Sequence, residues 1–174
     1  MATNIEIKAT YEDLEHAKRI CGLLAAKYIG TDLQLDTYFK VHSGKLKLRE
    51  STLSKNQLIF YNREIKYDAK RSDYFLVPIE GEPAPLRCLL SYALGVIAQV
   101  QKTRDIFIIA CTRIHLDNVE SLGKFIEFEY LINNSNSMEN GIKELDQIRE
   151  RFDIQESNLI DVSYSDLLQK NADS

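Results

Sequence analysis

The sequence has little cysteine, the residue that most often cross-links small secreted domains or binds structural metals. Among its 174 residues there are three, Cys21, Cys88 and Cys111. They are odd in number, widely spaced and set among mostly apolar neighbours, which argues against a disulfide framework and against a Cys-x-x-Cys metal site. We therefore expect all three to be reduced side chains in the core.

Long apolar runs and an excess of one charge are also missing. No run approaches the roughly 20 residues that a membrane-spanning helix needs, and the first residues lack an apolar signal core after a basic start. Charged residues make up 28% of the chain, and the formal net charge is −4. This balance argues against a protein that coats nucleic acid or a membrane surface. We expect a cytoplasmic protein with no nucleic-acid partner and no membrane partner.

Glycine and proline interrupt the chain in few places. The three prolines, Pro78, Pro83 and Pro85, lie close together around Gly81, and we find no repeat, low-complexity tail or interdomain linker. A chain of 174 residues with 44% hydrophobic content is long enough to bury a sizeable core. We expect residues 1–174 to form one domain.

Alternation of apolar and polar residues, typical of half-buried strands, covers most of the chain. It predicts extended segments at residues 3–10, 33–41, 45–49, 57–63, 70–79, 96–104 and 105–111 and a hairpin at residues 112–129. Apolar residues at helical spacing predict helices at residues 11–28 and 138–152 and shorter ones at residues 85–95 and 163–168, with Gly30 and Thr31 ending the first. Many strands with few helices between them favour an α+β protein built on an antiparallel meander or barrel.

The hairpin at residues 112–129 is the most informative segment. In its first strand Arg113, His115 and Asp117 share one face, and in its second strand Glu127 and Glu129 alternate with apolar residues. Each strand therefore has one ionic side and one apolar side. Other strands repeat this pattern with the opposite charge, as in Lys45, Lys47 and Arg49 or in Lys102 and Arg104.

Two assignments of these faces compete. In the first, the apolar sides fill the barrel and the charges face solvent, which is the common arrangement for a single strand. In the second, the charges line the interior. The second is favoured because the helices at residues 11–28 and 138–152 have broad apolar stripes that need an apolar outer sheet surface. The cations and carboxylates are also sorted by strand, whereas a solvated surface tends to mix signs.

A barrel lined by ions needs ligands. Burying an unpaired ion costs several kcal/mol even after relaxation, so internal ion pairs would relieve only part of the charge. Excess lysine and arginine would attract an anion, and grouped carboxylates would attract a divalent cation such as Mg²⁺ or Mn²⁺. A triphosphate that carries a metal ion meets both demands.

The ordered motifs resemble those of the CYTH superfamily, the triphosphate tunnel metalloenzymes, which include class IV adenylyl cyclases and thiamine triphosphatases. The resemblance covers residues 4 to about 168. The family opens with Glu-x-Glu-x-Lys, which here reads Asn-Ile-Glu-Ile-Lys at residues 4–8. Alternating basic residues follow Gly44, and a Lys-Thr-Arg run precedes Arg-Ile-His-Leu-Asp and Leu-Gly-Lys-Phe-Ile-Glu-Phe-Glu. Together with the Asp-Thr-Tyr-Phe run at residues 36–39, these motifs are most similar to the class IV cyclase branch.

The resemblance implies an eight-stranded antiparallel tunnel with a charged interior and helices packed outside. Carried over by position, the residues that would bind the triphosphate are Lys8, Lys47, Arg49, Tyr61, Arg63, Lys70, Lys102, Arg104 and Arg113. The residues that would hold Mg²⁺ or Mn²⁺ are Glu6, Asp117, Glu127 and Glu129. Lys8, Arg113 and His115 would take part in catalysis, with His115 either a base or a group that orients a carboxylate or phosphate.

One departure from the family pattern divides the functional hypotheses. Asn4 replaces the first glutamate, so one carboxylate is missing from a second metal site. We expect a metal-dependent enzyme, first an adenylyl cyclase that converts ATP to cyclic AMP and pyrophosphate. The alternatives are a triphosphatase acting on thiamine triphosphate or inorganic triphosphate, and a module that binds triphosphate or polyphosphate without catalysis. A homodimer is a further expectation.

Overall fold

The computed structural model describes residues 2–66, 69–132 and 137–172, with side chains except at residues 2 and 63–72. The eight strands are β1 (Ala2–Thr10), β2 (Lys27–Phe39), β3 (Lys45–Ser51), β4 (Gln57–Lys66), β5 (Ala69–Pro78), β6 (Val96–Ile109), β7 (Thr112–Val119) and β8 (Gly123–Ile132). The helices are α1 (Leu14–Leu23), α2 (Ala84–Leu94), α3 (Met138–Arg151) and α4 (Tyr164–Ala172). Among the described helices, none is both long enough and apolar enough to span a bilayer.

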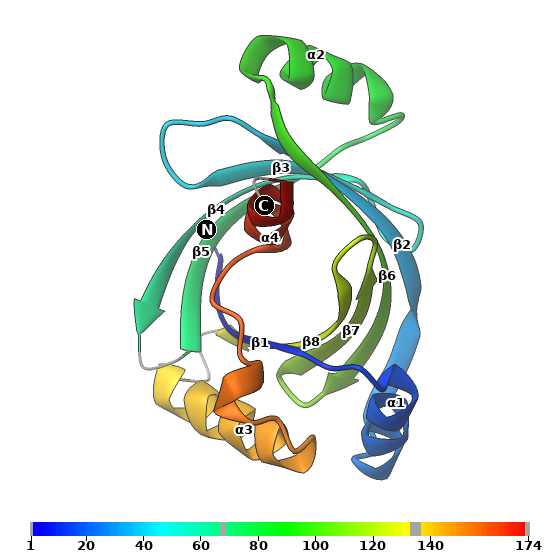
Figure 1. The fold of residues 1–174 in the computed structure, drawn as a ribbon, viewed down its shortest axis with the longest axis vertical. Helices are drawn as coiled ribbons and strands as arrows, with labels where there is room; N and C mark the ends of the chain where they lie inside the picture. Colours follow the sequence, from blue (N-terminus) through cyan, green and yellow to red (C-terminus); the bar gives the residue numbers. More distant parts are fainter. Residues whose placement is uncertain (1, 67–68, 133–136, 173–174) are drawn as a thin grey trace.

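The strands close into one antiparallel barrel in the order β1-β5-β4-β3-β2-β6-β7-β8, as Figure 1 shows. The predicted tunnel architecture is therefore confirmed. Helices α1 and α3 both lie against the outside of the barrel, on the same side of it. From α3 the chain runs across one end of the barrel to α4, and on the way Ile160 donates a backbone hydrogen bond to Lys8 (2.9 Å).

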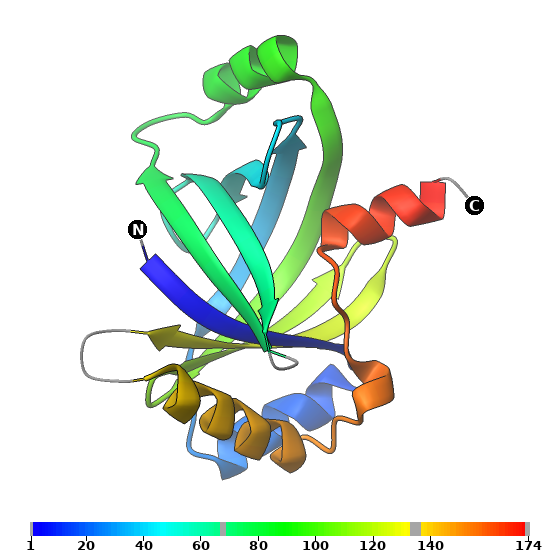
Figure 2. The same cartoon turned by 90° about the vertical axis from the view of Figure 1, so that its left-hand side faces the viewer.

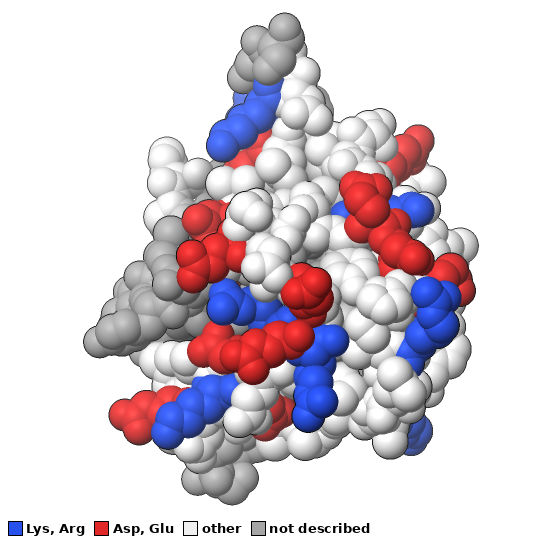
Figure 3. Space-filling model, turned by 60° about the horizontal axis from the view of Figure 1, so that its bottom comes forward, with Lys and Arg blue, Asp and Glu red and all other residues white. Residues whose placement is uncertain are grey.

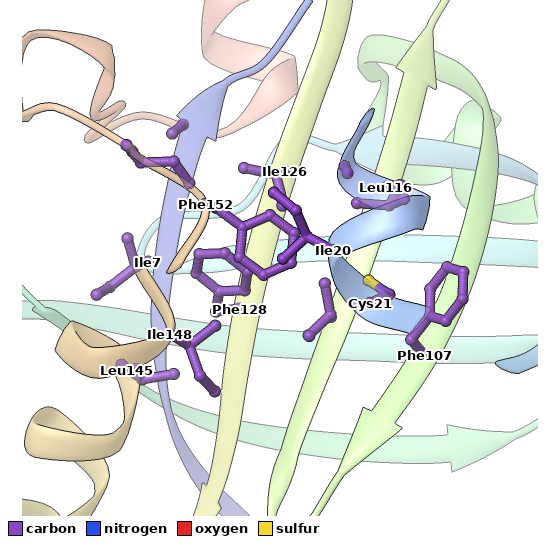
Figure 4. Packing of buried hydrophobic residues seen from close by; sticks show 14 of the residues in the cluster. Ile7, Ile20, Cys21, Phe107, Leu116, Ile126, Phe128, Leu145, Ile148 and Phe152 are labelled. Carbon is purple, nitrogen blue, oxygen red and sulfur yellow. The ribbon is translucent and has the colours of Figure 1, made fainter. Parts of the chain in front are cut away.

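The barrel is apolar outside and ionic inside. On β1, Ile5, Ile7 and Ala9 belong to a core that lies between the sheet and the two helices α1 and α3 (Figure 4). The alternate residues of the same strand, Glu6 and Lys8, are 6% and 4% exposed and line the interior cavity. Both sides of β1 are buried because helices cover one side and the barrel encloses the other.

The first helix and the second strand differ from the sequence prediction. Helix α1 ends at Leu23, and Ala25, with a φ of 53°, turns the chain before β2 begins at Lys27. Tyr28 fits the helical spacing but is a strand residue, because its ring packs on Phe107 of the neighbouring β6 (centroids 5.0 Å apart). Gly30 does not end a helix; it lies at a register shift in the pairing of β2 with β6.

Residues 96–111, predicted as two strands, contain the single 14-residue strand β6. It pairs with β2 on one side and β7 on the other. The expected break near Asp105 marks a change of side-chain type along the inner face, where Lys102 and Arg104 are followed by Ile106 and Ile108.

The cysteines are less buried than the sequence predicted. All three cysteines are free, as expected, but only Cys21 is buried, whereas Cys111 is half-buried and Cys88 is exposed. Cys88 lies on α2, every residue of which is at least partly exposed. Helix α2 stands outside the ring of strands, above β2 and β3 in Figure 1 and away from α1 and α3 (Figures 1 and 2), so its apolar spacing does not mark a buried stripe.

The outer surface near α1 and α3 carries both signs of charge. In Figure 3 acidic and basic side chains lie next to one another across this face. Lys18 of α1, for example, contacts Glu15 and also Asp105 of β6 (2.9 and 3.0 Å). The outer face thus carries the two signs of charge side by side.

Gly141 of α3 allows this helix to lie close to the barrel. A Cβ at this position would be 2.6 Å from Tyr130 Cδ1 and 2.9 Å from Ile5 Cδ1. We expect Gly141→Ala to destabilise the protein by about 1–3 kcal/mol, although alanine favours a helix, because the added methyl overpacks this contact. Chemical denaturation measures the change.

Gly22→Ala in α1 is the matched control, because a Cβ there meets nothing within 4 Å. Alanine should stabilise that helix by up to about 1 kcal/mol. A stabilising Gly141→Ala would show that α3 packs less closely on the barrel than described.

Candidate active site

A cavity of about 520 Å³ occupies the barrel interior and receives side chains from all eight strands. Its lining includes most of the predicted site residues: Glu6, Lys8, Lys47, Arg49, Tyr61, Lys102, Arg104, Arg113, His115, Glu127 and Glu129. Asp117 lies behind this lining with 0% exposure. The side chains of Arg63 and Lys70 lie outside the described part of the structure. Residues separated by more than 100 positions in sequence thus converge on one space.

Asp36 of β2 organises three of the cations. Its carboxylate accepts hydrogen bonds from Lys47 Nζ (2.9 Å), from Arg49 Nε and NH2 (both 2.7 Å) and from Lys102 Nζ (3.3 Å). Burial opposes ionisation, but Arg49, Lys102 and Lys47 together hold the pKa of Asp36 well below its usual value. Asp36 is therefore a carboxylate at neutral pH.

The two lysines of this cluster are less easily protonated than free lysine. Burial, with Arg49 nearby, holds the pKa of Lys47 well below its ordinary value. Burial and the cations Arg104 and Arg49 lower the pKa of Lys102 to about 8, while Asp36 acts to raise it. An anion that entered the cavity would favour the charged form of both side chains.

A second cluster surrounds Asp117 of β7. Arg104 Nε and NH2 each donate to one carboxylate oxygen (both 2.6 Å), and the hydroxyl of Tyr164 donates to Oδ2 (2.7 Å). Despite burial, Arg104 lowers the pKa of Asp117. The ring of Tyr164 is 4.3 Å from Lys8 Nζ, a cation–π contact that fixes the lysine from its other side.

Glu127 and His115 form the third group. Glu127 lies 3.5 Å from Lys8 Nζ and 3.6 Å from Arg104 NH2, and despite burial these cations hold its pKa well below the usual value. His115 Nδ1 is 3.0 Å from Arg104 Nη1, which can only donate, and 3.3 Å from Glu127 Oε1, which can only accept, so this nitrogen lies between the two charged groups. Burial and Arg104 lower the pKa of His115, so a neutral imidazole orients the guanidinium here.

Glu6, Glu129 and Asn4 present oxygen atoms on the β1–β8 wall. Glu6 and Glu129 are direct cross-strand partners on the inner face, where two carboxylates favour a nearby cation, and Arg113 Nη1 lies 3.4 Å from Glu129 Oε2. Asn4 donates from Nδ2 to Glu129, and its buried Oδ1 has no hydrogen-bond partner among the described residues. Carboxylate and amide oxygens are ligands that suit Mg²⁺ or Mn²⁺.

The predicted metal ligands do not all fit this site equally. Within the described residues, no three Asp, Glu, His or Cys side chains converge as a metal cluster. Asp117 does not fit as a ligand in its present position, because Arg104 and Tyr164 occupy both of its oxygens. Glu6 and Asn4 Oδ1 fit best, whereas Glu129, whose oxygens accept from Asn4 and Arg113, would have to exchange these contacts for a metal.

The two ends of the cavity differ. At one end, Tyr164 of α4 packs with Phe125, Val100 and Val119 in an apolar cluster. Elsewhere the lining includes the apolar residues Ile29, Leu53, Leu76, Ile106 and Ile108. Three of these, Ile29, Leu53 and Leu76, are 40–44% exposed, so they mark where the cavity opens to solvent. Arg113 is also at the open part, with 42% of its side chain exposed.

Sequence reasoning missed Asp36 and Tyr164 as site residues. Asp36 was available from hairpin geometry, because counting back from the turn at Gly44 places it opposite Arg49, as the register confirms. Tyr164 gave no such signal, since its partner Asp117 is 47 residues away and only the path of the chain across the barrel end brings them together.

These features define a class: antiparallel barrels whose closed interior, rather than their surface, holds a dense set of ion pairs. The chain belongs to the CYTH domain family, which matches residues 2–164. No curated protein sequence matches the chain.

Solved structures share the fold at low sequence identity. The PH1012 protein of Pyrococcus horikoshii has a TM-score of 0.82 and 22% identity, covering 94% of this chain and 98% of its own. A candidate adenylate cyclase of Vibrio parahaemolyticus has a TM-score of 0.77 and 17% identity, with 95% and 97% covered. HpAC1 of Hippeastrum, a candidate adenylyl cyclase with a dominant triphosphatase activity, has a TM-score of 0.68 and 13% identity, with 98% and 96% covered.

Proposed function

We propose that this protein is a metal-dependent enzyme that binds an organic triphosphate inside the barrel. The observation that carries this proposal is the grouping of Lys8, Lys47, Arg49, Lys102 and Arg104 around one cavity, each in contact with a carboxylate. A phosphate chain offers several anionic oxygens in a row, which suits cations projecting from several strands. Fixed positive charges of this kind are what phosphoryl transfer requires.

The apolar opening supports an organic rather than a purely inorganic substrate. Ile29, Leu53 and Leu76 are partly exposed to solvent around the cavity, and such side chains stabilise the less polar part of a ligand. In our proposal the phosphate chain lies against the cations of β1, β3 and β6, and the organic group lies near the opening.

A divalent cation, Mg²⁺ or Mn²⁺, is part of the proposal. Glu6 and Glu129 would hold it, with Asn4 Oδ1 as a weaker ligand and Glu127 within the same wall. When bound, the ion would supply positive charge that offsets the negative charge of the phosphate groups. Lys8 and Arg113 would contact the substrate, and His115 would keep Arg104 oriented toward it.

The first candidate reaction is that of an adenylyl cyclase. The 3′-hydroxyl of ATP would attack the α-phosphorus and release pyrophosphate, while the buried cations stabilise the charge on the phosphorus oxygens. The motif resemblance to the class IV cyclase branch and the fold shared with the Vibrio parahaemolyticus structure support this candidate.

The second candidate is triphosphate hydrolysis, in which water attacks the terminal phosphorus. The fold shared with HpAC1, for which triphosphatase activity is dominant, supports this reaction with the same phosphate-binding residues. Thiamine triphosphate and inorganic triphosphate are its candidate substrates, and the apolar opening favours thiamine triphosphate between the two.

Product analysis tests the proposal and separates the candidates. The purified chain is incubated with ATP, thiamine triphosphate or inorganic triphosphate, with Mn²⁺ or Mg²⁺ and with a chelator as the control. A cyclase yields cyclic AMP and pyrophosphate, and a hydrolase yields phosphate; both activities should disappear with the chelator. Absence of any product, together with absence of triphosphate binding in calorimetry, would contradict the proposed function.

Asn4→Glu distinguishes an enzyme from a binding module. If Asn4 has removed the catalytic metal, restoring the carboxylate should raise turnover from near zero. In a competent enzyme the change should alter turnover little, because Glu6 and Glu129 already hold the metal. Glutamine at the same position is the control, since it lengthens the side chain without adding charge.

A further inference from the structure

Asp36 lies in the barrel wall behind the cavity rather than in its lining. It is 0% exposed, so a ligand in the cavity would meet the cations before it met this carboxylate. Nevertheless the carboxylate contacts three cations from two strands, Lys47 and Arg49 on β3 and Lys102 on β6. Glu127, by comparison, contacts two lysine or arginine side chains, Lys8 and Arg104.

The strand register explains why one carboxylate can reach three cations. Asp36 is directly opposite Arg49 in the β2–β3 pair and opposite Val100 in the β2–β6 pair. Lys47 and Lys102 are diagonal neighbours on the same inner face, within reach of long side chains. These hydrogen bonds, at 2.7–3.3 Å, restrict the rotamers of the lysines and the arginine before an anion arrives. The conformational entropy that these side chains would otherwise lose on binding is therefore already lost in the free protein.

We propose that Asp36 is the positioning residue of the cavity: its carboxylate holds the charged ends of Lys47, Arg49 and Lys102 together at the place where they contact the triphosphate. This inference rests on the proposed function for the identity of the anion. Asp36 itself does not touch the substrate; it acts through the three cations.

The two possible roles of this carboxylate predict opposite effects. If only the net charge of the cavity matters, then removal of Asp36 adds one positive charge, and anion binding should tighten. If positioning matters, removal should weaken binding, because three buried cations lose their common acceptor. Asp36 also raises the pKa of both lysines against burial and neighbouring cations, so without it they would lose their protons at lower pH.

The charged and titratable groups around Lys47 and Lys102 determine how strongly each lysine holds its proton. Lys47 faces Asp36, Arg49, Lys102 and the tyrosines Tyr38 and Tyr61; Lys102 faces Asp36, Asp117, Arg49, Arg104 and Tyr164. Asp36 is the carboxylate common to both sets, and its loss leaves Lys47 among cations and phenols.

The test uses the full chain and inorganic triphosphate without metal, followed by calorimetry from about pH 6 to about pH 9. We expect Asp36→Asn to bind at least about tenfold more weakly near pH 8 and to remain weaker than wild type near pH 6, because the cations lack their common acceptor at either pH, and the pH midpoint of binding should shift down. Asp32→Asn is the matched control: Asp32 is a buried carboxylate on the same strand, but Gln34, Ser51 and backbone N–H groups hold it. It should leave the midpoint unchanged.

Asp36→Glu covers the case in which the asparagine variant fails to fold. It retains the charge and displaces it by one methylene, so a purely electrostatic role predicts wild-type affinity and positioning predicts a loss of about threefold or more. Equal or tighter binding by the folded variants at every pH would overturn the inference.

A ligand-free measurement separates this inference from the proposed function. The pKa values of Lys47 and Lys102 can be followed by NMR in the empty protein, and both should fall in Asp36→Asn. If wild type does not bind inorganic triphosphate but the lysine pKa values fall, the proposed function fails while the contact of Asp36 with the two lysines stands. Unchanged pKa values would overturn the inference even if wild type binds.

Discussion

Arg104→Met should lower the free energy of unfolding by about 3–5 kcal/mol, the largest stability loss that we expect from a single change in the barrel interior. Arg104 is 4% exposed and makes the paired hydrogen bonds to Asp117. Methionine fills a similar volume but leaves Asp117 and Glu127 without their strongest cationic neighbour. Urea denaturation, with the midpoint and slope compared with wild type, measures the loss.

The double variant Arg104→Met with Asp117→Leu is the control. Replacing both partners of a buried ion pair by apolar residues removes the uncompensated charge, so most of the lost stability should return. Recovery would be incomplete, because Tyr164 also loses the acceptor of its hydroxyl. A loss below about 1 kcal/mol in the single variant would show that solvent reaches this ion pair.

If the proposed function holds, Lys8→Met should lower kcat/KM for the proposed triphosphate substrate by about 100- to 1000-fold, the range expected when one fixed group that stabilises developing charge is removed. Lys8 is 4% exposed, and its Nζ is 3.5 Å from Glu127 and 4.3 Å from the ring centroid of Tyr164. These contacts aim the ammonium group into the cavity, where methionine supplies similar bulk without charge. Steady-state kinetics with saturating metal measures the effect.

Lys18→Met is the matched control for this change. Lys18 lies on α1 outside the barrel and contacts Glu15 and Asp105, so its loss should alter kcat/KM by less than about twofold. If Lys8→Met retained activity within about threefold of wild type, the catalytic site would not lie along the β1 wall.

The inside-out arrangement of the barrel was predictable because it depends on local periodicity. Alternation puts Lys47 and Arg49 on one face and Leu46 and Leu48 on the other whatever the partner strand is. The apolar stripe of α3 then requires an apolar surface, and the outer residues of β1 and β8 supply it. Both facts are in the sequence before any tertiary contact forms.

The pairing of charges was not predictable in the same way. Lys102 contacts Asp36 across 66 residues, and Tyr164 contacts Asp117 across 47. Such pairs depend on strand order and on barrel closure, which period-two patterns do not specify. The early end of α1 has a similar cause, because Tyr28 satisfies helical spacing but pairs with Phe107 of the distant strand β6 in the sheet.

By itself the sequence determined that most segments are strands, that each has an ionic and an apolar face, and that helices need the apolar one. Tertiary structure alone decided which cation meets which carboxylate, and so which acids remain available for a metal. The physical reason is the sequence distance over which each feature is set. The side of a strand on which a residue lies depends on neighbours one or two residues away. An interior ion pair forms only when closure of the barrel brings side chains that are distant in sequence within a few ångströms, in a space that excludes water.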